Sequence, residues 1–236
     1  IVIGKAAHTP HCEPKFIRPQ IIESLERLQT AQLDIFCLHR DNPEVPVSEF
    51  VDALTEVKNE GLIDLIGASN WEFHRFSEAR EYASISGRES FTVLSNNFSL
   101  AEMIEPVWPG CVGVTDQYLN YLIEQEVMLF PWSSQARGFF IKQKEVMSSD
   151  HFSNPNLDEE IRVWHHEKNL KRRQACFDIA EEKNVQPIQI ALAYVLHKSH
   201  LIFPLIGPRT VFETNSSIQA SQINLTSKEL QALAQD

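Results

Sequence analysis

Short apolar runs alternate along this chain with amphipathic stretches of about 12 to 18 residues. The runs are rich in Ile, Leu, Val and Phe, and the stretches between them repeat their apolar residues with helical spacing. Strands that are apolar on both faces belong to parallel sheets with helices packed over them, so the alternation predicts an α/β fold. We expect six such strands, at residues 1–5, 33–39, 62–70, 91–97, 127–134 and 201–207.

Two of the helical stretches are well delimited by the sequence. The stretch "VSEFVDALTEVKNEG" (47–61) ends at a glycine suited to the C′ position of a helix. The stretch "IRPQIIESLERLQT" (17–30) places its apolar residues on one helix face. That face is expected to contain Ile21, Ile22, Leu25 and Leu28.

The size of the chain suits one α/β barrel or two small domains. With 236 residues, 43% of them hydrophobic, it can bury a large core. One polar stretch, 138–168, interrupts the rhythm of strands and helices, which then resumes. We therefore predict a single domain over residues 1–236, in which 138–168 is a loop inserted above the sheet.

Charge and cysteine content argue against several classes of protein. The net charge of −11 provides no long-range attraction to nucleic acid or to an anionic membrane, so we expect neither as a partner. No apolar run approaches the roughly 20 residues that span a bilayer. The cysteines form no C-x-x-C pair, which argues against a disulfide framework or a structural zinc site and favours the reducing cytoplasm. They are Cys12, Cys37, Cys111 and Cys176.

Polar or ionisable residues stand where nearly every predicted strand ends. In a parallel α/β barrel this rim carries the catalytic and binding groups. Polar residues also gather at strand ends without any function, and for a single one of them that is the commoner case. Their recurrence at successive strand ends favours a functional rim. The residues are Lys5, His39, Ser69 with Asn70, Asn97, Trp132 with Ser133, and Gly207 with Arg209.

Several phrases of the sequence, in this order, resemble the aldo-keto reductase family. They are "LDIFCLHRDNP", "GLIDLIGASNW", "FPWSSQARGFF", "PIQIALAYVLH" and "IFPLIGPRT", and the resemblance runs from residue 1 to about residue 230. The phrases "SNNFSLAE" and "VWPGCVG" are similar to a bacterial subgroup whose members are sometimes joined to a second oxidoreductase domain.

The resemblance implies a fold and a cofactor. The fold is the (β/α)8 barrel, of which about six βα units would be present in this chain. The cofactor is NADPH, which the family binds in an extended form without a Rossmann domain. The chain accordingly has no G-x-G-x-x-G after a strand.

The resemblance also implies a reaction. Hydride moves from the nicotinamide to the carbonyl of a small-molecule aldehyde or ketone, while a Tyr hydroxyl donates the proton. Lys5 matches the family's Lys, a cation that favours ionisation of that Tyr, and His39 matches the His that orients the carbonyl. Lys5 could instead be a strand-end side chain that reaches solvent. Arg40 and Asp41 are expected to form a local ion pair or loop contacts.

Residues that match the nicotinamide end of the family's cofactor site follow two strands. Ser69 and Asn70 match side chains that hydrogen-bond the carboxamide. Trp132 matches an aromatic ring that stacks on the nicotinamide, although a core tryptophan is the alternative. Many relatives carry Gln where this chain has Ser95, so we expect an altered carboxamide shell.

The match continues along the phosphates of the cofactor. Ser133 and the backbone of 134–138 would approach the pyrophosphate, and Gly138 would permit close contact.

The adenosine end of the cofactor matches the last part of the chain. Arg209 and Thr210, which follow Gly207 and open a helix, would hold this end and a 2′-phosphate. Glu213 and Ser217 match positions that touch adenine in relatives.

The family's catalytic Asp and Tyr have no counterpart in this sequence. In the family they lie on strands before the segment that matches "IVIGK", and the chain begins inside that apolar run without a Met. Either such a segment precedes residue 1, or a partner supplies it, or the chain has a binding role. Residues 1–236 alone are expected to be nearly inactive, because all four tyrosines lie in helical patterns. These are Tyr82, Tyr118, Tyr121 and Tyr194.

Three functions therefore stay open at this point. The first is an NADPH-dependent carbonyl reductase, which the resemblance favours. The second is a non-catalytic nicotinamide-binding regulatory module. The third is an appendage of a second oxidoreductase domain.

Two histidine-containing clusters need a separate interpretation. The cluster "HTPHCEP" (8–14) matches no common zinc spacing, so we predict a substrate-pocket loop and no metal. The cluster "WHHEKNLKRR" (164–173) stands at the start of an amphipathic helix, and we expect it to form a solvated face.

Overall fold

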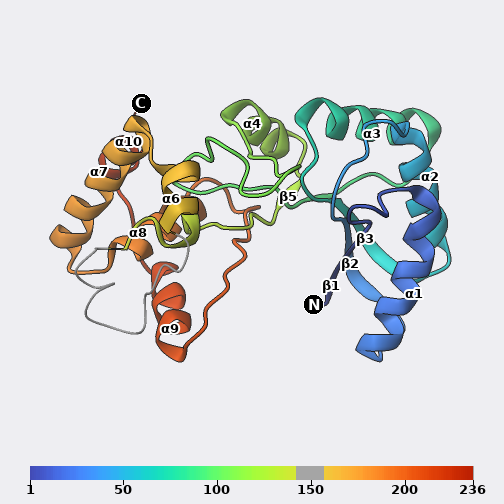
Figure 1. The fold of residues 1–236 in the computed structure, drawn as a ribbon, viewed down its shortest axis with the longest axis horizontal. Helices are drawn as coiled ribbons and strands as arrows, with labels where there is room; N and C mark the ends of the chain where they lie inside the picture. Colours follow the sequence, from blue (N-terminus) through green and yellow to red (C-terminus); the bar gives the residue numbers. More distant parts are fainter. Residues whose placement is uncertain (142–156, 236) are drawn as a thin grey trace. The chain divides into compact units, whose positions relative to one another are not determined.

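The computed structural model describes residues 1–141 and 157–235 of the chain (Figure 1). The chain divides into two compact units, Ile1–Asn96 with Val114–Leu129, and Asn97–Gly113 with Phe130–Asp236. The first unit contains the β-sheet, and the helices of the second begin after residue 130. That residues 1–236 form a single domain stays a prediction.

The sheet of the first unit has five parallel strands in consecutive order. An order without reversal is that of a barrel wall, whereas a doubly wound sheet reverses its order at a switch point. Each of the first four strands is joined to the next by a helical crossover, as parallel pairing requires. The strands are β1 (Ile3–Ala6), β2 (Leu33–Leu38), β3 (Ile63–Ala68), β4 (Val93–Leu94) and β5 (Met128–Leu129).

The register of the sheet brings the strand ends level with one another. Ala6 pairs with Leu38, Leu38 with Ala68, and Ala68 with Leu94. The residues that follow this row therefore leave the sheet along a common edge. This edge is the rim at which the sequence analysis expected the polar residues that follow the strands.

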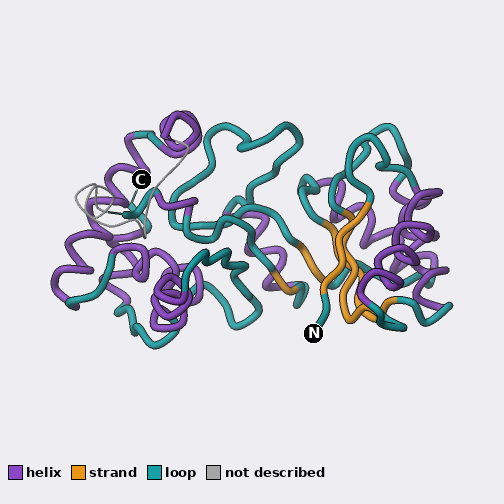
Figure 2. The backbone as a smooth tube through the Cα atoms, turned by 60° about the horizontal axis from the view of Figure 1, so that its bottom comes forward, coloured by secondary structure: helices purple, strands orange, loops and turns teal. Residues whose placement is uncertain are grey.

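Helices α1 (Ile17–Leu28), α2 (Val47–Asn59) and α3 (Phe73–Ser86) cover one face of the sheet, as Figures 1 and 2 show. Helix α2 ends as predicted, since Gly61 follows it with φ of 77°. The apolar face predicted for α1 was partly wrong. Ile17, Ile21 and Leu25 are buried, whereas 53% of Leu28 is exposed because the helix ends there.

Two shorter elements complete the first unit. The 3-10 helix η1 (Pro14–Phe16) leads into α1, and helix α4 (Asp116–Glu124) leads into β5. The hydroxyl of Thr115 caps α4 by accepting a hydrogen bond from the Tyr118 N–H at 3.2 Å.

The prediction of a sixth strand at 201–207 was wrong, because no strand of the described sheet lies there. Pro204 lacks an N–H and cannot donate to a ladder. The segment keeps one extended hydrogen bond, from the N–H of Leu205 to the carbonyl of Pro131 at 3.0 Å. It therefore runs beside the chain that leaves β5 without joining the sheet.

The second unit contains a 3-10 helix and five α-helices in its described part. Its centre is α8, whose residues from Ile190 to Val195 are all buried because they are apolar on every side. The elements are η2 (Ala136–Gly138), α6 (Leu157–Trp164), α7 (Glu167–Lys183), α8 (Pro187–Leu196), α9 (Val211–Ala220) and α10 (Ser227–Leu233).

Two predictions fall on the segment that joins η2 to α7. The middle of the predicted inserted loop 138–168 lies outside the described residues, while α6 occupies its last part. The solvated face predicted for 164–173 was wrong in part. Trp164 is buried, and the guanidinium of Arg172 donates hydrogen bonds to the carbonyls of Leu100 and Gln235. The basic run thus also ties chain segments together.

None of the helices within residues 1–141 and 157–235 is long and apolar enough to cross a membrane.

Candidate active site

Lys5 stands on β1 near the rim of the sheet and extends toward the ends of β3 and β4. Its Nζ donates hydrogen bonds to the hydroxyls of Ser95 at 2.7 Å and Ser69 at 3.3 Å. Burial lowers the pKa of the Lys5 ammonium, the Cys37 thiol opposes that shift, and the Arg40 charge adds to it. No carboxylate of the described chain lies within ion-pair distance of Lys5. The ammonium is therefore held by neutral hydroxyls at a partly buried position.

Ser69 and Asn70 form a hydrogen-bonded link between Lys5 and His39. The Ser69 hydroxyl donates to the Ser95 carbonyl at 2.6 Å and accepts from Lys5. The Asn70 amide donates to the Ser69 hydroxyl at 3.1 Å and to the His39 carbonyl at 3.3 Å. Asn70 has φ of 58°, a left-handed conformation that asparagine tolerates better than most residues. The carboxamide contacts expected for Ser69 and Asn70 stay predictions.

His39 follows β2 directly, and its N–H donates to the Ala6 carbonyl at 2.6 Å. Burial lowers the pKa of its imidazole to about 4, and the positive charges of Lys5, Arg40 and His8 add to the shift. The ring is therefore neutral near pH 7. A neutral imidazole can donate one hydrogen bond to a carbonyl oxygen without carrying a charge.

The two residues after His39 find different partners. Arg40 makes a loop contact, donating to the His39 carbonyl at 3.1 Å. Asp41 forms a two-pronged ion pair with Arg75 of α3, with distances of 2.9 and 3.0 Å. Arg75 also donates to the carbonyls of Asn42 and Val45, at 3.3 and 2.9 Å. It thereby fixes the loop that follows His39.

None of the four tyrosines hydrogen-bonds Lys5 in the described structure. Tyr82 donates to the Asp52 carboxylate at 3.2 Å on the outer helices. Tyr118 is buried, which raises the pKa of its phenol far above the usual range, the reverse of what an acid catalyst needs. Tyr121, in α4, packs on Phe73 of α3, and Tyr194 lies within α8.

The residues of the "HTPHCEP" cluster turn toward separate neighbours. The rings of His8 and His39 lie edge to face with centroids 4.7 Å apart, and His11 packs in the same way on Phe16. Cys12 donates to the Ala7 carbonyl. In the part of the chain that the structure covers, no group of three or more His, Cys, Asp or Glu side chains could hold a metal ion.

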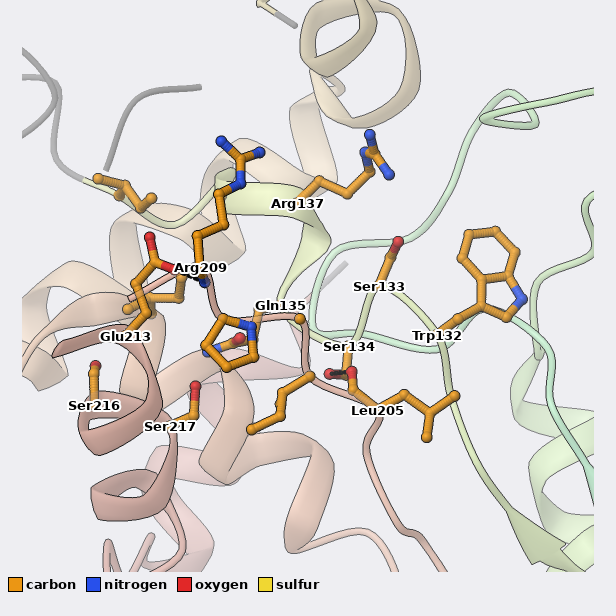
Figure 3. Close-up of a pocket in the computed structure, with 16 residues that line it drawn as sticks. Trp132, Ser133, Ser134, Gln135, Arg137, Leu205, Arg209, Glu213, Ser216 and Ser217 are labelled. Carbon is orange, nitrogen blue, oxygen red and sulfur yellow. Dashed lines mark hydrogen bonds between the residues drawn. The ribbon is translucent and has the colours of Figure 1, made fainter. Parts of the chain in front are cut away.

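The second unit contains a pocket of about 430 Å³. One wall is the segment that follows β5, a second is 205–209, and a third is α9, as Figure 3 shows. Seven of the twelve residues that the sequence analysis assigned to catalysis or cofactor binding line it. They are Trp132, Ser133, Gly138, Gly207, Arg209, Glu213 and Ser217.

The pocket wall between residues 133 and 138 is a tight left-handed turn. Ser133, Ala136, Arg137 and Gly138 have φ of 50°, 47°, 51° and 100°. A Cβ on Gly138 would also approach the side chain of Ile141 to 3.2 Å, so both the backbone conformation and the space favour glycine. The close contact with a pyrophosphate that the sequence analysis expected at Gly138 stays a prediction.

Gly207 differs, because a Cβ there would meet nothing within 4 Å. Its place in the pocket lining means that an added methyl group would point into open space or into a bound ligand. The fold does not require this glycine by close contact.

The third wall is built around the N-terminus of α9. The Thr210 hydroxyl caps the helix by accepting from the Glu213 N–H at 3.2 Å, and the Glu213 carboxylate accepts from the Arg209 N–H. The Arg209 guanidinium is exposed and forms no ion pair with any described residue. A helix N-terminus beside an unpaired guanidinium is suited to an anion. The hydrogen bond between the Glu213 carboxylate and the backbone N–H of Arg209 was not predicted from the sequence.

Sequence reasoning missed several residues of the pocket. Arg137 forms an ion pair with Glu159 at 2.7 Å, and its guanidinium lies 5.1 Å from the centroid of the Trp108 ring. Both partners come from distant segments, so no local pattern could reveal them. Trp132 lines the pocket while its indole N–H is buried without an acceptor in the described residues. The other missed lining residues include Ile141, Ile188 and Ser216, whereas Ser134 and Gln135 belong to the segment 134–138 whose backbone was expected there.

A parallel sheet in consecutive strand order, with ionisable residues at one rim, is the design of the α/β-barrel class. The chain belongs to the Aldo/keto reductase family, whose sequence profile matches residues 2–235. The fold agrees. A thermostable aldo-keto reductase solved in complex with the inhibitor epalrestat superimposes with a TM-score of 0.73 and 21% identity, over 98% of this chain and 69% of that one.

Several proteins of similar sequence come from fungi. Norsolorinic acid reductase B of Aspergillus parasiticus is 26% identical over 222 residues, which cover 93% of this chain and 54% of that protein. Versiconal hemiacetal acetate reductase of Aspergillus parasiticus is 27% identical over 89% of this chain and 58% of its own length. The chain spans about half the length of the curated relatives it matches. Its similarity to a bacterial subgroup stays a prediction.

Proposed function

We propose that this chain contributes to NADPH-dependent reduction of an aldehyde or ketone to an alcohol. One observation carries the proposal: the partly buried Lys5 ammonium is linked through Ser69 and Asn70 to the backbone of His39. A cation and a neutral imidazole held together at one strand rim suit a reaction in which negative charge develops on a carbonyl oxygen. Two relatives are named as reductases, norsolorinic acid reductase B and versiconal hemiacetal acetate reductase, which supports a reduction as the reaction.

The pocket of the second unit fits the phosphate-bearing part of a dinucleotide. Gly207 leaves open space in its lining, Arg209 has no ion-pair partner among the described residues, and α9 directs its N-terminus there. The bound nicotinamide would supply the hydride. Within the second unit, the residues that would hold this part of the cofactor are Trp132, Ser133, Gly138, Gly207, Arg209, Thr210, Glu213 and Ser217.

His39 would orient the substrate. Because burial keeps its imidazole neutral, His39 can donate a hydrogen bond to the carbonyl oxygen over the whole neutral pH range. Lys5 would lower the pKa of an acid beside it and stabilise the developing oxyanion. Ser69 and Ser95 would keep the ammonium in place, since both hydroxyls accept from it.

The proton donor is the component that these residues do not provide. All four tyrosines lie in helices, and none bonds Lys5 in the described part of the chain. We therefore infer that residues 1–236 by themselves reduce carbonyls very slowly. Positioned acid catalysis contributes roughly 10²- to 10⁴-fold in rate. The same observation favours a second candidate function, a non-catalytic nicotinamide-binding module.

We further propose the setting in which the chain acts. It would form one domain of a cytoplasmic protein with small-molecule carbonyl substrates, either alone or joined to a second oxidoreductase domain. The net charge of −11 supports the exclusion of nucleic acid as a partner.

Turnover decides between the two candidate functions. Residues 1–236 and the complete polypeptide that contains them are assayed side by side on a panel of aldehydes, with NADPH absorbance as the readout. The proposal expects turnover by the complete polypeptide and little or none by residues 1–236. Binding of NADPH without turnover by the complete polypeptide would support the binding module instead.

A further inference from the structure

The loop that follows β1 holds His8 against His39. Ala7 is buried in a left-handed conformation with φ of 58°, which few non-glycine residues adopt. Its N–H donates to the Gln20 side chain of α1 at 2.7 Å, and its carbonyl accepts from the Cys12 thiol. The His11 N–H then donates to the His8 carbonyl at 2.7 Å. Several bonds thus fix the direction in which His8 leaves the rim.

His8 is the exposed member of the group around His39. The centroids of the two rings are 4.7 Å apart with planes at 78°. Lys5 is engaged by two serine hydroxyls, and Arg40 is buried and donates to the His39 carbonyl. Of these side chains, His8 is therefore the one best exposed to a ligand bound at His39.

The hydrogen bonds of His8 define what its free edge offers. Its Nδ1 lies 3.0 Å from the Thr9 carbonyl oxygen. A carbonyl can only accept, so Nδ1 carries the hydrogen in this contact. In the neutral ring, Nε2 is then an acceptor.

We propose that His8 is a specificity-determining residue, whose Nε2 accepts a hydrogen bond from a hydroxyl group of the substrate bound at His39. The protein then prefers carbonyl compounds that carry a hydroxyl over similar compounds that lack a hydrogen-bond donor. This inference rests on the proposed carbonyl reductase function. The inference gives a role to the "HTPHCEP" segment, which takes no part in hydride or proton transfer.

A matched pair of substrates isolates the contact. In 3-hydroxybenzaldehyde the hydroxyl donates, whereas in 3-methoxybenzaldehyde it cannot, and the two rings are electronically similar. We expect the complete polypeptide to favour the hydroxy compound about 3- to 10-fold in kcat/KM, the range of one neutral hydrogen bond. The ratio of the two values is independent of how much of the enzyme is folded.

Three variants assign the preference to His8. His8→Phe keeps an aromatic ring beside His39 without an acceptor, and it should bring the ratio to about one by slowing only the hydroxy compound. His8→Gln keeps an acceptor and should retain part of the preference. His11→Phe is the control, because His11 packs on Phe16 in the same loop and its loss should leave the ratio unchanged.

Failure of the inference differs visibly from failure of the proposed function. If neither aldehyde is reduced, the proposed function is overturned, and the inference falls with it. If both are reduced equally, or if His8→Phe leaves the preference intact, only the inference is overturned. A preference for 3-carboxybenzaldehyde over the hydroxy compound that is lost in His8→Phe also overturns it, because that result requires a positively charged edge on His8 and not an acceptor.

Discussion

The ion pair between Asp41 and Arg75 should contribute strongly to stability, because it is buried next to the rim. The two side chains are only 9% and 10% exposed, and they share two hydrogen bonds of 2.9 and 3.0 Å. The guanidinium also lies 5.4 Å from the centroid of the Trp71 ring. Asp41→Asn removes the negative charge while keeping the size of the side chain, so that a buried cation is left with neutral acceptors.

The expected loss follows from the contacts that remain. Removing one partner of a buried ion pair costs about 3 to 5 kcal/mol. Arg75 keeps its bonds to the carbonyls of Asn42 and Val45, so we expect the lower end, about 3 kcal/mol. For a chain of this size, about 1 kcal/mol shifts the unfolding midpoint by roughly 2 to 4 °C, which predicts a decrease of about 6 to 12 °C. Circular dichroism on heating measures this shift.

A surface pair with the same hydrogen-bond distances provides the control. The Arg18 Nε contacts both carboxylate oxygens of Glu60, at 3.0 and 2.9 Å, but the two side chains are 56% and 39% exposed. Glu60→Gln should leave the unfolding midpoint almost unchanged, because water solvates the remaining partner. Equal shifts for the two variants would refute the reasoning that burial, and not hydrogen-bond geometry, sets the effect.

Three further predictions concern the site. Gly207→Ala should leave the unfolding midpoint unchanged but weaken NADPH binding in a calorimetric titration. Gly138→Ala should cost about 1 kcal/mol in stability, because φ is 100° there. Equal stability of the two variants would contradict this expectation. The pKa of His39 falls from 6.5 to about 4 on folding, so its contribution to stability is full above pH 6.5 and is lost as the pH falls toward 4. In denaturant unfolding across this window, the free energy of unfolding should decrease less steeply with falling pH in His39→Gln than in the unmodified protein. Identical slopes for the two proteins would argue against burial of a neutral ring. Arg209→Ala should weaken the binding of NADPH more than that of NADH, by on the order of 1 to 3 kcal/mol. Equal weakening of the binding of both cofactors would contradict the role proposed for Arg209.

The part of the fold that depends on short-range pattern could be predicted from the sequence. Five of the six expected strands formed, because burial on both faces leaves a run of apolar residues that is visible locally. The rim followed from the same logic, since parallel strands end at a common edge. The sixth run, 201–207, has the same composition but contains Pro204, and its failure to join the sheet reflects a missing N–H donor.

The long-range partners of the rim residues could not be predicted. Lys5 finds its acceptor in Ser95, 90 residues later, and Asp41 finds Arg75 across 34 residues. Arg137 pairs with Glu159 by the same kind of remote contact. Such pairings depend on strand register and crossover geometry, which a single sequence does not encode as a spacing.

The role of Lys5 is the centre of the proposed function, and its removal is the most direct test. Lys5→Met keeps a flexible side chain of similar length at this partly buried site but removes the charge that faces Ser95 and Ser69. In the complete polypeptide, kcat for aldehyde reduction should fall by roughly 10²-fold or more while NADPH affinity changes little. Lys15→Met, an exposed site on η1, should change neither value. An unchanged kcat in Lys5→Met would contradict the proposed function, because the reaction would then proceed without the cation at the strand rim.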